Sequence, residues 1–176
     1  MRKLLNFIDK CSACVGYVAA WIVLPLIFAT VYEVFSRYAL NAPTIWAYEL
    51  GYMATGSGFL LGTAYALREK AHIRIDVMYM HFQPRTRAII DFLGYSLLML
   101  PFGFWLSYRL GIYAFDSFVS GERSGESAWN PIIWPYRAVF FIGIGMLTLQ
   151  CVAQWLRAMQ AAFDKDTNYK TDAYDG

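Results

Sequence analysis

The sequence predicts an all-α integral membrane protein with four transmembrane helices. Four long stretches carry almost no charged side chains, and they cover residues 11–36, 46–67, 92–108 and 138–156. A helix needs about 20 mainly apolar residues to cross the hydrocarbon core of a bilayer. The apolar fraction of 58% and the charged fraction of 16% also depart from a soluble domain, in which about 45–50% and about 25% are usual.

Each apolar stretch reaches spanning length once its flanks are added. Pro25 and Pro101 fall inside the first and third spans, where each removes one backbone hydrogen bond and bends its helix. The four spans belong to a single domain, residues 1–163, and a polar tail follows. The predicted spans cover about residues 11–36, 46–67, 88–113 and 132–157, and the tail covers residues 164–176.

The N-terminal segment is basic, and the distribution of Lys and Arg sets the predicted orientation. Most of these residues lie before residue 11, between residues 68 and 87, or after residue 156. Because cytoplasmic segments carry the excess of Lys and Arg, both termini are expected inside the cell. A cleaved signal peptide is disfavoured, since the apolar run continues to Ser36 and a signal core has about 7–15 residues.

Three connectors join the spans. Asn41-Ala-Pro43 predicts a short outside turn, because proline cannot extend the preceding helix. Residues 71–84 predict an extended or partly helical segment on the inner membrane surface, between the second and third spans. Pro84 is then expected to start the third helix. Residues 116–130 are hydrophilic and predict an outside loop.

The spans lack the side chains that coupled transport, electron transfer or catalysis would need inside the membrane. Their central portions contain no Asp, Glu, Lys, Arg or His, and the two histidines, His72 and His81, lie in the inner connector. Ionisable groups inside spans are usually functional, so their absence argues against a pump, a complete carrier or a haem protein. Cys11 and Cys14 form a C-x-x-C without further zinc ligands nearby. We expect no catalytic residues, no cofactor, no metal and no nucleic-acid partner.

A stripe of small residues marks the second span. Ala54, Gly58, Gly62 and Ala66 recur at every fourth position. Such a stripe lets two helices approach closely in a membrane. The stripe can pack inside this protein or against a partner, and the sequence leaves both possibilities open.

Charged residues at the membrane boundaries are further candidate contacts. Glu33 and Arg37 are one helical turn apart and Glu49 opens the second span, so Arg37 is expected between two acids. A local ion pair that anchors the hairpin is favoured over a docking site for an outside partner. In the inner connector, His72, Arg74 and Asp76 indicate an interfacial segment whose arginine meets lipid phosphate. A metal site built from His72, Asp76 and His81 is disfavoured.

Two of these regions resemble a known family. The first contains Glu33-Val-Phe-Ser-Arg37-Tyr38, Asn41-Ala-Pro43, Trp46 and Glu49, and the second contains Gly62-Thr-Ala-Tyr65-Ala-Leu-Arg68 and His72-Ile-Arg-Ile-Asp76. Their order and spacing, with Pro131 and Trp134-Pro-Tyr136 before the fourth span, resemble the small membrane subunit of TRAP (tripartite ATP-independent periplasmic) transporters, the DctQ type.

The resemblance implies a partnership. A periplasmic protein captures an organic acid with a carboxylate, and a large membrane subunit moves it with sodium by an elevator-like motion. The small subunit, a separate chain in the bacterial inner membrane, supports the large subunit as a non-catalytic scaffold. The positions carried over for structure, lipid contact or subunit contact are Arg37, Trp46, Glu49, His72 and Asp76. A membrane redox or enzyme subunit and a general membrane assembly factor are the alternative functions.

Overall fold

The computed structural model describes residues 2–69 and 82–163, and most of these residues form helices. Within them the only β-type pairing is an isolated bridge between Arg123 and Ile132. The predicted all-α class is therefore confirmed for this part of the chain. The elements are α1 (Arg2–Ala39), α2 (Ala47–Arg68), α4 (Pro84–Gly94), the π-helical segment η1 (Tyr95–Met99), α5 (Leu100–Ser120) and α6 (Trp134–Phe163).

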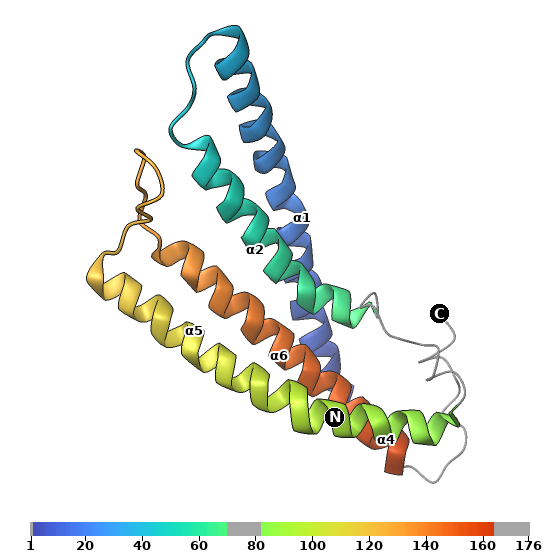
Figure 1. Ribbon diagram of the computed structural model, residues 1–176. Coiled ribbons are helices and arrows are strands. Elements are labelled where there is room, and N and C mark those ends of the chain that lie inside the picture. Colours follow the sequence, from blue (N-terminus) through green and yellow to red (C-terminus); the bar gives the residue numbers. More distant parts are fainter. Residues whose placement is uncertain (1, 70–81, 164–176) are drawn as a thin grey trace.

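The helices are arranged as a layer rather than as a closed bundle. α1 packs against α2, α2 against α6, and α6 against α5 and α4. Figure 1 shows two antiparallel hairpins, α1–α2 and α4/α5–α6, which lie side by side with α2 next to α6. We call the end with residues 40–46 and 121–133 the loop end. The opposite end, where α1 begins and α6 finishes, is the terminal end.

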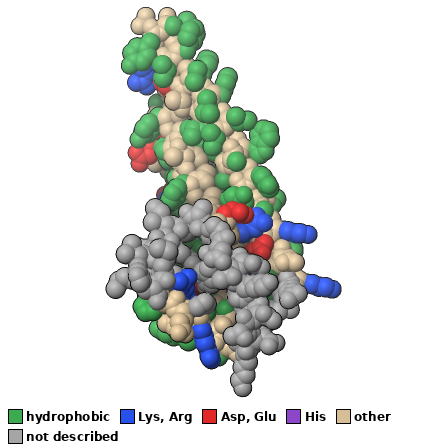
Figure 2. Space-filling model, turned by 90° about the vertical axis from the view of Figure 1, so that its right-hand side faces the viewer, with side chains coloured by type: hydrophobic (Ala, Val, Ile, Leu, Met, Phe, Trp, Pro, Cys, Tyr) green, Lys and Arg blue, Asp and Glu red, His purple; other side chains and the backbone are tan. Residues whose placement is uncertain are grey.

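Burial is inverted relative to a soluble protein. The largest fully buried side chains are polar, namely Gln150, Glu49, Ser12 and Ser117. Large apolar side chains are exposed instead, with Trp21 at 70% and Phe59 at 73%. Figure 2 shows hydrophobic side chains spread over the helices, while most charged side chains on this face gather toward one end. Exposed apolar surface on this scale indicates a contact with a membrane or with a partner.

Three stretches of the described residues are long and apolar enough to span a bilayer. They are Lys3–Ala39, Arg85–Ser120 and Trp134–Phe163. α2 has 22 residues, which is about 33 Å at 1.5 Å per residue, but its tyrosines, glycines and hydroxyl residues make it less apolar. The structure thus supports three of the four predicted spans. The fourth span, the single-domain organisation and the placement of both termini inside the cell stay predictions.

The helices extend beyond the predicted spans. α1 begins at Arg2, so the basic segment expected before the first span is part of the helix. Leu5 and Ile8 of this segment are buried against Ala153 of α6, and this packing stabilises the added turns. α1 also continues through Pro25 without interruption.

Two prolines and a glycine define the third helical stretch. α4 begins at Pro84, as predicted, at a position where a missing N–H breaks no helical bond. η1 ends two residues before Pro101, which cannot donate to the carbonyl four residues earlier, and the wider π-helical turn accommodates this loss. α5 ends at Ser120 with Gly121 in the left-handed conformation at φ 61°. The predicted loop at 116–130 was therefore wrong for its first five residues, which are helical.

Candidate functional site

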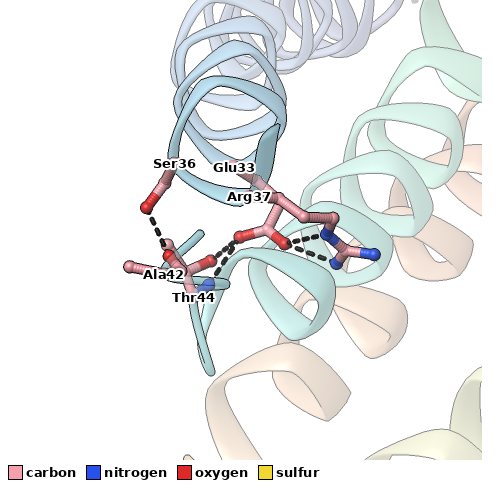
Figure 3. Close-up of polar contacts among 5 residues, drawn as sticks. All are labelled: Glu33, Ser36, Arg37, Ala42 and Thr44. Atoms are coloured by element: carbon pink, nitrogen blue, oxygen red, sulfur yellow. Dashed lines mark hydrogen bonds and ion pairs between the residues drawn. The ribbon is translucent and has the colours of Figure 1, made fainter. Parts of the chain in front are cut away.

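The first candidate position is the Glu33–Arg37 pair at the loop end of α1 (Figure 3). Arg37 donates from Nε to Glu33 Oε1 at 2.9 Å, and its Nη2 donates to the same oxygen. Glu33 Oε2 accepts from the backbone N–H of Thr44 at 2.9 Å and from the Thr44 hydroxyl. Both carboxylate oxygens are therefore engaged. Glu33 joins the last turns of α1 to the connector before α2, while the Arg37 side chain remains 56% exposed.

Further local contacts shape the same connector. The Ser36 hydroxyl donates to the carbonyl of Ala42, whose N–H donates back to the Ser36 carbonyl at 3.0 Å (Figure 3). Trp46, directly before α2, stacks on Tyr32 of α1 with ring centroids 5.9 Å apart. The candidate residues Glu33, Arg37 and Trp46 therefore lie in one network that holds the α1–α2 hairpin closed.

Glu49 does not take part in the Arg37 pair, so the expectation that Arg37 lies between two acids was wrong. The Glu49 side chain is fully buried, and its Oε1 accepts a hydrogen bond from the Ser127 hydroxyl. Its Oε2 has no partner among the described residues. Glu49 is turned toward the connector between α5 and α6 rather than toward α1, and this direction separates it from Arg37.

The small-residue stripe of α2 lines a groove on the α1–α2 hairpin. Two hollows of about 530 Å³ and 370 Å³ adjoin there and share Leu26 and Thr55. A Cβ atom built at Gly58 would lie 3.7 Å from the Ala19 carbonyl oxygen, which is ordinary contact, and one built at Gly62 would meet nothing within 4 Å. The stripe was expected to pack either inside this protein or against a partner. Gly62 therefore does not serve tight packing inside the protein.

Close helix packing depends on other glycines, which lie outside the stripe of small residues in α2. A Cβ at Gly143 would lie 3.0 Å from Leu60 Cβ and 3.1 Å from its carbonyl oxygen, at the crossing of α6 and α2. A Cβ at Gly16 would lie 2.7 Å from Tyr65 Cβ, at the crossing of α1 and α2. Gly16 is a single glycine in an apolar run, and Gly143 is accompanied only by Gly145, so the sequence offers no stripe of small residues that distinguishes them.

A buried polar chain at the terminal end was also missed. The Ser12 hydroxyl donates to Gln150 Oε1 at 2.8 Å, and Gln150 Nε2 donates to Asp9 Oδ1 at 3.0 Å. Arg157 Nη2 donates to Asp9 Oδ2 at 2.5 Å. This series of hydrogen bonds joins α1 to α6. One signal was available, because Asp9 and Ser12 are three apart and Gln150 and Arg157 are seven apart, so each pair shares a helix face.

The remaining candidates, His72, Arg74 and Asp76, lie outside the described residues. Within the described ranges, no three His, Cys, Asp or Glu side chains lie close enough together to hold a metal ion. The polar groups that the structure brings together therefore hold helices to one another.

Comparison with protein families gives the decisive observation. A family model with the description "Tripartite ATP-independent periplasmic transporters, DctQ component" matches residues 26–161. The chain belongs to the DctQ family. The match runs from the middle of α1 nearly to the end of α6 and so includes both hairpins. DctQ proteins are bacterial membrane proteins and transporter components that work with a large membrane subunit and a periplasmic binding protein. No curated protein and no solved structure matched the chain.

Proposed function

We propose that this DctQ chain is the non-catalytic scaffold subunit of a sodium-coupled TRAP transporter. The observation that carries the proposal is the layered packing of its helices. A layer in the order α1, α2, α6, α5 leaves two broad apolar faces, and its interior is held by polar contacts between helices. Such a shape provides contact area to a membrane partner and to lipid, and the described spans offer no cluster of ionisable groups for moving an ion.

The proposed partner is the large membrane subunit, encoded as a separate chain. In an elevator-type transporter one part moves across the bilayer while another part stays in place. The small subunit contributes to the stationary part, since a wide layer anchored by interfacial aromatic residues resists tilting. The solute is an organic acid with a carboxylate that a periplasmic protein delivers. The chain lies in the inner membrane with four spans and both termini inside the cell.

The proposed contact positions fall into three groups. Gly58 and Gly62 line the open groove on the α1–α2 hairpin, and the exposed Arg37 lies at its loop end. Trp46 supports this hairpin by stacking on Tyr32, and Glu49 joins it to the connector between α5 and α6 through Ser127. His72, Arg74 and Asp76 of the inner connector, which lie outside the described residues, are proposed as further contacts with the partner or with lipid.

Co-purification and uptake measurements test the proposal. The tagged chain should bring down a large membrane subunit in mild detergent. Both subunits together, with the binding protein, should accumulate an organic acid in vesicles when sodium is added outside. The chain reconstituted alone should move no solute. Sodium-driven accumulation by the isolated chain would contradict a scaffold role.

A further inference from the structure

The groove on the α1–α2 hairpin is continuous and changes in polarity along its length. Its loop-end part is lined by Glu33, Arg37 and Tyr48, among others. The adjoining part is lined by apolar and small residues such as Val23, Phe59 and Gly62. The two hollows together run from the end of α1 toward its middle. A ligand that fills them needs a polar head and a flexible apolar tail.

The polar end has hydrogen-bond donors to spare. Glu33 engages Arg37 through Nε and Nη2, and the other Glu33 oxygen is already bound by Thr44. The remaining guanidinium N–H groups have no partner among the described residues, and the Arg37 side chain is 56% exposed. Arginine forms strong, directional hydrogen bonds with phosphate. The free side of this guanidinium therefore suits an anionic phosphate group.

The apolar end has room that the protein does not fill. Apart from its chain neighbours and the nearby backbone of α2 itself, no described protein atom lies within 4 Å of a Cβ built at Gly62, and Gly58 is in ordinary contact with α1. The side chains that line an empty apolar groove lack dispersion contacts on that side. In a bilayer, lipid acyl chains are available to fill such a groove. A single acyl chain is flexible and follows a groove between two helices.

We propose that this groove binds one phospholipid, with its phosphate on Arg37 and one acyl chain along Val23, Phe59 and Gly62. The lipid would fill the seam between α1 and α2 on the uncovered face of the hairpin. The inference rests on the proposed function only in placing this hairpin in the bilayer.

A photoreactive phospholipid with a diazirine in its acyl chain tests the site. The full chain is reconstituted in vesicles that contain a small fraction of this probe, irradiated and digested. Labelling should concentrate on peptides that contain residues 16–26 and 54–62. Gly62→Leu, which fills the apolar end, and Arg37→Gln, which removes the guanidinium, should each lower this labelling about tenfold.

Gly94→Leu is the matched control, because a Cβ at Gly94 also meets nothing within 4 Å but the residue lies on α4, away from the groove. Its labelling of the groove peptides should equal that of the unchanged chain. Equal labelling in all three variants would overturn the proposal. So would labelling that disappears when the large subunit is present, because the partner would then occupy the groove.

Complex formation is scored in parallel samples that also contain the large subunit. Loss of co-purification with the groove labelling intact would contradict the scaffold function alone. Loss of groove-specific labelling with the complex intact would contradict the lipid site alone.

Discussion

Glu49 and Ser127 lie 78 residues apart in the sequence, and the Ser127 hydroxyl donates a hydrogen bond to the buried Glu49 carboxylate. Ser127 belongs to the connector between α5 and α6, whereas Glu49 lies in the first turn of α2. The contact therefore joins the two hairpins at the loop end. At the terminal end, the chain of Ser12, Gln150, Asp9 and Arg157 joins them again.

Ser127→Ala should destabilise the protein by about 1–3 kcal/mol, because the buried Glu49 carboxylate then loses its one hydrogen bond among the described residues. Thermal unfolding in detergent should show a lower midpoint. Ser120→Ala is the control, since the exposed Ser120 hydroxyl makes only a 3.4 Å contact with the Ser117 carbonyl. Equal midpoints for the two variants would mean that the Glu49–Ser127 contact does not stabilise the fold.

Gly143→Ala should weaken the packing of α6 on α2. The added Cβ would lie 3.1 Å from the Leu60 backbone carbonyl oxygen, and a backbone atom cannot turn away as a side chain can. Overpacking of this kind costs about 1–3 kcal/mol. The unfolding midpoint in detergent should therefore fall.

Gly145→Ala is the matched control for that substitution. Gly145 lies two residues after Gly143 on α6, and a Cβ added there would meet nothing within 4 Å. Because alanine favours helix by up to about 1 kcal/mol over glycine, Gly145→Ala should be neutral or stabilising. A fall in midpoint that matches that of Gly143→Ala would contradict the close approach to Leu60.

Arg37→Glu should lower solute uptake more than it lowers the amount of protein in the membrane. It places two carboxylates one helical turn apart at the loop end and removes the exposed guanidinium. Uptake by the complex and quantitative immunoblots of the membrane fraction measure the two effects. The double exchange Glu33→Arg with Arg37→Glu restores opposite charges but removes the acceptor of the Thr44 hydrogen bonds. A parallel fall in uptake and protein amount would show that Arg37 serves only the stability of the hairpin.

Local features of the fold were predictable from sequence, and contacts between distant segments were not. The turn at Asn41-Ala-Pro43 and the helix start at Pro84 follow from proline geometry. The Glu33–Arg37 pair follows from helical spacing. The partner of Glu49 depends instead on how the two hairpins meet, and no local rule contains that information.

Helix ends show the same difference. Hydropathy identifies where a helix can cross a membrane, but α1 starts about nine residues earlier than the first predicted span. Those residues are helical because Leu5 and Ile8 pack against Ala153, which is a tertiary contact. The place of α2 in the layer also depends on tertiary contacts. α2 is less apolar than the three helical stretches that could span a membrane, yet it packs between α1 and α6.

Asp9 and Arg157 provide the last prediction, at the terminal end. Their side chains are 20% and 30% exposed, so water weakens the ion pair only in part. A double-mutant cycle with Asp9→Asn and Arg157→Met should give a coupling energy of about 1 kcal/mol, measured from unfolding in detergent. Gln150→Leu should cost more than either single change, because it removes the partner of both Ser12 and Asp9 inside the layer. Additive effects of Asp9→Asn and Arg157→Met, with an unchanged midpoint for Gln150→Leu, would mean that the hairpins are joined mainly by the apolar contacts of α2 with α6.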